Sequence, residues 1–94
     1  MTQPVPTIGR IVLYTLNEQD AEAIKASRRN AGEVHLSNEV RAGQEFPAVI
    51  VASWGDQPTS ACNLKVMLDG PDHFWATSRS VGDGPFHFRW PVRA

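Results

Sequence analysis

Three histidines have the widest chemical range of any side chains in this chain, because imidazole can bind a metal ion or transfer a proton. They are His35, His73 and His87, and no two of them have the i, i+4 spacing that places metal ligands on one helix face. A metal-dependent enzyme would need the fold to gather all three from distant segments. We keep this as the third of three functional hypotheses, and we expect no bound metal or cofactor.

Nucleophilic catalysis requires a serine or cysteine beside a base. The candidates Ser53, Ser78 and Cys62 do not lie in a G-x-S-x-G elbow. Asp69 and Asp72 are closely spaced carboxylates, but they flank a Gly-Pro turn, and turn formation accounts for both. The sequence therefore predicts a binding protein and not an enzyme.

Aromatic and basic side chains offer a different chemistry, the recognition of nucleotides. Trp54, Trp75, Trp90 and Tyr14 lie in or near predicted strands. They either fill the core or present a ring on which a base could stack. The sequence leaves both interpretations open.

Two groups of basic residues accompany the aromatic ones. Lys25, Arg28 and Arg29 fall within one predicted helix, and Arg79 and Arg89 fall on predicted strands that adjoin the same turn. A guanidinium fork is a natural partner for a phosphate, although surface arginines are usually only solvated. Phosphate binding by either group is therefore a hypothesis.

The stretch "GPFHFRW", residues 84 to 90, alternates aromatic and titratable residues. In a strand, Phe86, Phe88 and Trp90 would face one side, and His87 and Arg89 the other. We expect the aromatic side to supply the core, at least through Phe88, with Trp90 ambiguous at the strand end. His87 and Arg89 then become candidates for ligand contact.

Composition sets the class of protein. The 94 residues form a single predicted domain, 1–94, with nine basic and ten acidic residues, a net charge of −1 and 41% hydrophobic residues. This balance argues against binding of long nucleic acid. The opening residues have neither the basic nor the apolar region of a secretory signal, and no apolar run is long enough for a membrane span, so we expect a cytoplasmic protein. The single cysteine, Cys62, is expected in the core.

Alternating apolar residues separated by turn residues predict a mainly β, α+β fold. The predicted elements are strands 7–16, 46–54, 61–68, 73–80 and 86–90, a helix at 17–30, a loop at 33–45 and a flexible N-terminus at 1–6. Residues 46–90 are expected to form an antiparallel meander. The five antiparallel strands should build an SH3-like barrel or a curved open sheet, with one helix inserted after the first strand.

The predicted helix has recognisable ends. Asn17 is a good N-cap, and Gly32 offers a C-terminal stop. Helical spacing predicts an inward stripe that is small and only half apolar. Its members are Asp20, Ala23, Ile24, Ser27 and Ala31.

Four segments together resemble a group of small proteins of tailed bacteriophages. They are "PTIGRIVLY" at 6–14, "AEAIKASRR" at 21–29, "HLSNEVRAGQEFPAVIVASWGD" at 35–56 and "LDGPDHFWATSRSVGDGPFHFRWP" at 68–91. The resemblance covers nearly the whole chain. The group often has a histidine before the tyrosine of the first segment, and this chain has Leu13 there.

A phage origin suggests, by analogy of size and chemistry, a small anti-defence protein acting in the host cytoplasm. Such a protein would sequester a nucleotide-derived immune messenger, of the cyclic oligonucleotide or cyclic ADP-ribose type. The messenger would bind at the interface between subunits of a homo-oligomer. The ligand-binding candidates are Tyr14, Arg28, Arg29, His35, Trp54, His87, Arg89 and Trp90. The alternative is a virion-assembly or protein–protein interaction module, which predicts a flat hydrophobic patch without an enclosed polar pocket.

Overall fold

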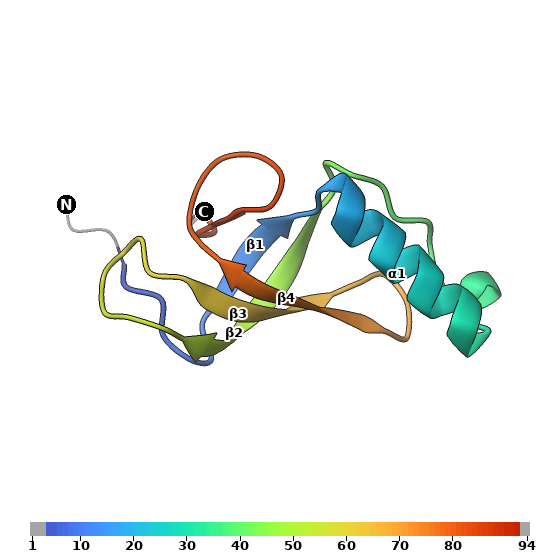
Figure 1. The fold of residues 1–94 in the computed structure, drawn as a ribbon, viewed down its shortest axis with the longest axis horizontal. Coiled ribbons are helices and arrows are strands. Elements are labelled where there is room, and N and C mark those ends of the chain that lie inside the picture. The colour runs from blue at the N-terminus through green and yellow to red at the C-terminus, as the bar shows by residue number, and fades with distance from the viewer. Residues whose placement is uncertain (1–3, 93–94) are drawn as a thin grey trace.

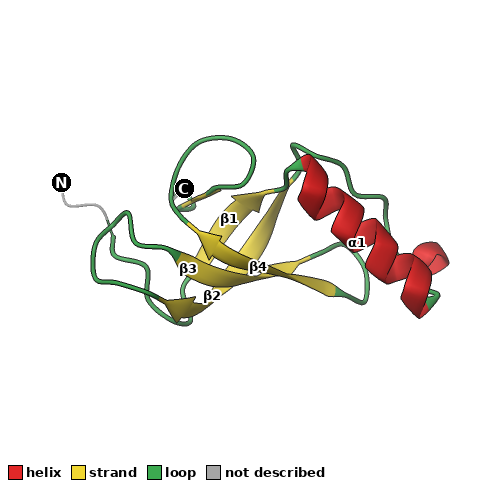
Figure 2. Ribbon diagram, in the orientation of Figure 1, coloured by secondary structure: helices red, strands yellow, loops and turns green. Residues whose placement is uncertain are grey.

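The computed structural model describes residues 4–92, which form one five-stranded sheet and one main helix. The helix and the first four strands are labelled in Figures 1 and 2. In chain order the elements are β1 (Ile11–Thr15), α1 (Glu18–Ala31), the short 3-10 helix η1 (Val34–Leu36), β2 (Glu45–Ser53), β3 (Cys62–Met67), β4 (His73–Arg79) and β5 (Phe88–Arg89). The strand order is β4-β3-β2-β1-β5, and every neighbouring pair is antiparallel. The predicted α+β fold, with a helix inserted after the first strand, is confirmed. The sheet is curved and open, so the closed barrel does not form.

The last strand occupies a different place from the one expected. β2, β3 and β4 form a meander, but β5 pairs with β1 at the opposite edge, so the meander predicted over 46–90 is wrong in its final strand. On its other side, Phe88 forms an isolated parallel bridge with Val81, in the segment that follows β4. The amide of Gly82 donates to the Phe88 carbonyl at 3.0 Å, and the amide of Phe88 donates to the Ser80 carbonyl at 3.2 Å. Curvature therefore brings the chain after β4 close to the β1 edge.

The stretch at 84–90 is not one continuous strand. Phe86 has a φ of 76°, in the left-handed region, which breaks the extended alternation before Phe88. Phe88 is fully buried, as expected, but Phe86 is 39% exposed and lies with its ring 3.8 Å from the Arg79 guanidinium. The prediction that Phe86 joins the core is therefore wrong.

α1 begins and ends where the sequence indicates. The Asn17 side chain accepts from the Asp20 amide, the Asp20 side chain accepts from the Asn17 amide, and Gly32 ends the helix in the left-handed conformation. These contacts form a capping box and a glycine C-cap. The helix lies at one end of the sheet (Figure 1).

The inward stripe of α1 differs from the predicted one. Ala23, Ser27 and Ala31 are exposed, and the buried residues are Asp20, Ala21, Ile24 and Arg28. The rotation of the helix follows its two buried charges, because Asp20 pairs with Arg79 and Arg28 pairs with Asp72. The predicted stripe does not contain Arg28, because helical spacing does not show that its charge has a partner inside the protein.

The core lies on the inner face of the sheet, where alternate residues of each strand point. Its strand members are Val12, Tyr14, Ala48, Ile50, Cys62, Leu64, Val66, Ala76 and Phe88, joined by Leu16, Ala21, Ile24, Val40 and Leu68. Cys62 is buried as predicted, and burial raises the pKa of its thiol to about 11. Of the segment 1–6, residues 1–3 lie outside the described residues, and Pro6 is buried.

Candidate functional site

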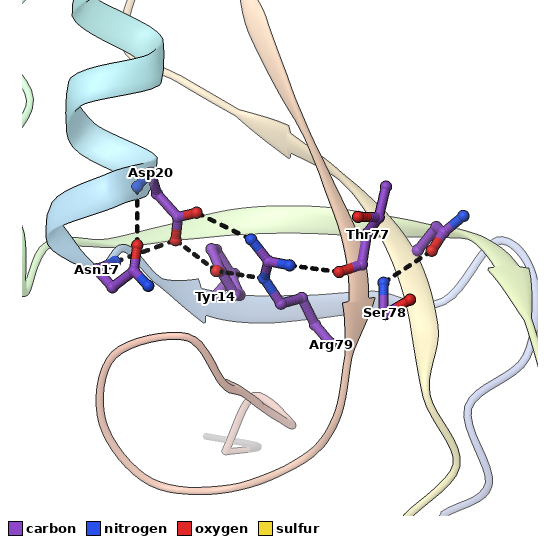
Figure 3. A network of polar contacts seen from close by, with 7 residues as sticks. Tyr14, Asn17, Asp20, Thr77, Ser78 and Arg79 are labelled. Carbon is purple, nitrogen blue, oxygen red and sulfur yellow. Dashed lines mark hydrogen bonds and ion pairs between the residues drawn. The ribbon is translucent and has the colours of Figure 1, made fainter.

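Tyr14 is the centre of a buried polar network and not a ligand-stacking platform (Figure 3). Its hydroxyl donates to Asp20 Oδ2 at 2.5 Å and accepts from Arg79 Nε at 2.7 Å. Burial, together with the hydrogen bond to Asp20, raises the pKa of Tyr14 well above its ordinary value. The ring belongs to the core, and the hydroxyl both donates and accepts a hydrogen bond within the protein. Tyr14 therefore holds Asp20 of α1 and Arg79 of β4 in place.

The same network joins α1 to the end of β4. Arg79 Nη2 donates to Asp20 Oδ1 at 2.9 Å, and Arg79 Nη1 donates to the Thr77 carbonyl. Ser78, between Thr77 and Arg79 in the chain, has a φ of 57°. Its amide donates to Asn63 Oδ1 on β3 at 2.9 Å. This left-handed residue bends β4 and turns Arg79 inward, toward the helix.

Arg28 has its guanidinium committed to protein groups. Nε and Nη2 donate to the two carboxylate oxygens of Asp72 at 2.9 and 3.1 Å, and Nη1 donates to the Asn38 carbonyl at 2.7 Å. This bidentate pair joins α1 to the turn before β4. The hydrogen bonds from Arg28 hold the pKa of Asp72 below its usual range.

We expect the Arg28–Asp72 pair to give a pH-dependent stability. A lowered folded-state pKa contributes stability that is present above the unfolded value, about 3.9, and is lost as pH falls through the folded value. The variant Asp72→Asn removes this titration. Urea titrations should show the wild type more stable than Asp72→Asn at neutral pH, with the difference shrinking below about pH 4. A difference that stays constant across this range would contradict the assignment.

Arg29 and His35 lie near Arg28, at one end of the molecule. Arg29 lines a pocket of about 450 Å³ together with Lys25, Arg28, Val34, Ser37, Glu39 and Val40, which we call the helix–loop pocket. His35 lines a neighbouring hollow of about 280 Å³, between η1 and the turn at Asp69 and Gly70. Two of the predicted residues therefore line one cavity, and a third is adjacent in sequence to its lining.

The residues predicted around β5 form a separate group. Arg89 Nε and Nη2 donate to the Glu45 carboxylate at 2.6 and 2.9 Å, which raises the pKa of Arg89. The His87 ring lies 3.3 Å from the Ser80 carbonyl. Trp90 packs on the core, edge-on to Phe88, and lies beneath the Arg10 guanidinium at 4.7 Å.

Trp54, the last predicted site residue, lies on a surface that the sequence did not single out. A row of paired residues crosses four strands from Ile11 through Val49 and Lys65 to Trp75. Side chains of paired residues lie on the same face of a sheet. Trp54 Nε1 donates to Asn63 Oδ1 at 3.4 Å, and Asn63 precedes Lys65 by two positions on β3.

We call this surface the outer sheet face. Its large exposed apolar residues are Ile11, Val51, Trp54, Met67 and Trp75, and Leu13, Pro47, Val49, Asn63, Lys65 and His73 lie among them. Trp54 and Trp75 are 64% and 57% exposed, and Met67 is 50% exposed. The sequence does contain a signal for this face. Apolar residues recur at the alternate strand positions that do not face the core, and a sheet face in contact with water rarely has such residues on several of its strands.

The eight predicted ligand-binding residues are therefore dispersed over the core, the helix–loop pocket, the hollow beside it, the β5 region and the outer sheet face. Within residues 4–92, no three His, Cys, Asp or Glu side chains are grouped so as to hold a metal ion. Neither helix in this range has the length and apolar character needed to cross a bilayer. The fold and surfaces define a small open-sheet α+β domain with large apolar side chains exposed on one face of the sheet. No known protein family, curated protein or solved structure matches the chain.

Proposed function

We propose that the chain is a non-catalytic interaction module that binds a protein partner through the outer sheet face. The observation that carries this proposal is the exposure of five large apolar side chains on one face of the sheet. Large apolar side chains exposed together on one face mark interaction sites, because burying them removes apolar area from water. Exposed tryptophans favour a protein partner, since tryptophan is enriched at interface hot spots.

The charge on this face defines the chemistry of the partner. Lys65 lies in the middle of the row, with Nζ 6.0 Å from the centre of the Trp75 ring and 3.5 Å from His73 Nε2. Among the residues that the structure describes, Lys65 takes part in no ion pair. The partner should therefore present an apolar ridge that packs on Trp75 and Met67, with a carboxylate that meets Lys65.

Sequestration of a nucleotide messenger stays a prediction. Arg28 and Arg89 are held by carboxylates, and Tyr14 is held by Asp20 and Arg79. Within residues 4–92, Arg29 takes part in no ion pair, and it lines the helix–loop pocket. A phage origin and homo-oligomerisation likewise stay predictions.

The interaction proposal is tested by placing the photo-crosslinker p-benzoylphenylalanine at Val49, in the centre of the outer sheet face. The matched control places it at Gln19, an exposed position on α1. In cells that make the protein, Val49 should give one dominant crosslink to another protein, and Gln19 should not. The crosslinked partner, once purified, is titrated against the wild type and against variants.

The variant Trp75→Ala should weaken binding of that partner about 30-fold or more, as expected for a tryptophan hot spot. Leu36→Ala removes an exposed apolar side chain from η1, outside the outer sheet face, and should leave the affinity unchanged. Equal crosslinking from Val49 and Gln19, or unchanged affinity in Trp75→Ala, would contradict the proposal. A crosslink to a second copy of the chain would replace the proposed partner with a homodimer.

A further inference from the structure

The helix–loop pocket is a second concave surface, and it shares no lining residue with the outer sheet face. It lies between the C-terminal half of α1 and the segment from η1 to Val40. Its volume of about 450 Å³ is within the range of small-molecule sites. Ligand binding in this pocket is independent of the proposed interaction module.

The walls of the pocket are fixed by hydrogen bonds. Arg28 is anchored by Asp72 and by the Asn38 carbonyl, as described above. Ser37 Oγ donates to the Glu33 carbonyl at 2.9 Å, and the Asn38 amide donates to the Asp69 carbonyl at 2.9 Å. The loop is therefore tied both to the end of α1 and to the turn before β4, so binding would require little ordering of the loop.

Two cationic side chains of the lining, Lys25 and Arg29, are available to bind an anion. Within residues 4–92, Arg29 takes part in no ion pair, and Lys25 has a single contact, with the exposed Glu22 at 3.8 Å. Exposed contacts of that length stabilise by only a few tenths of a kcal/mol. Lys25 and Arg29 are separated by one helical turn, so both side chains can reach one anion. Among the lining residues that the structure describes, Glu39 is the one acidic residue.

The remaining lining is apolar. Val40 is fully buried at the pocket and Val34 is half exposed. The lining identified among the described residues contains no aromatic side chain, so a base would find no ring on which to stack. The ligand that fits carries negative charge at one end and an apolar body at the other.

From this arrangement we propose that the helix–loop pocket binds a small organic phosphate. The phosphate is held by Lys25 and the Arg29 fork, and the apolar body packs on Val34 and Val40. A planar guanidinium matches phosphate oxygens in a bidentate manner, and an ammonium adds a second charge-assisted contact. Arg28 also lines the pocket, and its charge is paired with Asp72.

The test is a two-dimensional NMR titration of the full chain with phenyl phosphate, with phenol as the neutral analogue and inorganic phosphate as the anion without an apolar body. Phenyl phosphate should shift the amides of residues 25–40 saturably, with a Kd of about 1 mM or tighter. Phenol should bind more weakly because it lacks the phosphate, and inorganic phosphate should bind more weakly because it lacks the apolar body.

The double variant Lys25→Gln, Arg29→Gln should lose at least about tenfold in affinity for phenyl phosphate. Arg41→Gln removes an exposed cation outside this pocket and serves as the matched control, with no change expected. The proposal is overturned if phenyl phosphate gives no saturable shifts at residues 25–40, if phenol binds equally well, or if Arg41→Gln weakens binding as much as the double variant.

Discussion

Replacing Asp20 with alanine is expected to lower the free energy of unfolding by about 3–5 kcal/mol. The carboxylate accepts from the Arg79 guanidinium, the Tyr14 hydroxyl and the Asn17 amide, and both charged side chains are buried. Without it, a guanidinium and a phenol lose their acceptor inside the protein, and the helix loses one half of its capping box. Urea unfolding followed by tryptophan fluorescence measures the change.

Glu22→Ala is the matched control, because Glu22 is exposed on the same helix and its contact with Lys25 is long. Its effect should stay within about 0.5 kcal/mol. Should Asp20→Ala not fold, Asp20→Asn keeps the size and one acceptor oxygen and should still be clearly less stable than the wild type. A loss below about 1 kcal/mol in Asp20→Ala would show that the network contributes little.

Phe88→Ala should be nearly as destabilising, with an expected loss of about 3–5 kcal/mol. Phe88 is fully buried, is paired with Tyr14 across β1 and β5, and lies edge-on to Trp90 with 6.0 Å between ring centres. Truncation leaves a cavity between the sheet and the segment that follows β4. The change is measured by the same urea titration.

Phe86→Ala is the matched control for this variant, with the same substitution two residues away. Phe86 is 39% exposed and stacks on Arg79, so its truncation should cost about 1 kcal/mol. Equal losses in the two variants would contradict the assignment of Phe88 to the core and Phe86 to the surface of the Arg79 network.

Local signals in the sequence were enough to predict the fold class. Alternation placed β2, β3 and β4, and the Asn17 cap and Gly32 placed the ends of α1. Side-chain period and capping chemistry act over a few residues, so a single sequence contains them. The α+β class with an inserted helix follows from these elements and short turns, whereas the choice between a closed barrel and an open sheet does not.

The position of β5 and the inward face of α1 depend on contacts between distant residues. β5 adjoins β1 because the curved sheet brings the chain after β4 near Thr15, and α1 is rotated so that Arg28 meets Asp72. The spacing of residues along the sequence indicates neither of these two pairings. The site residues could not be predicted for the same reason. Arg28 and Tyr14 are residue types that often contact ligands, but in this structure they bind Asp72, Asp20 and Arg79.

The arrangement of β5 has a consequence for how the chain folds. Phe88 is hydrogen-bonded on one side to the segment at Ser80 and Gly82, while β5 pairs on its other side with β1, so its neighbours come from opposite edges of the sheet. Both neighbours must be in place before β5 can dock, and closing such distant contacts is slow. We therefore expect β5 to join after the folding transition state. In stopped-flow experiments, Phe88→Ala should accelerate unfolding and leave the folding rate nearly unchanged, whereas a slowed folding rate would place β5 in the nucleus.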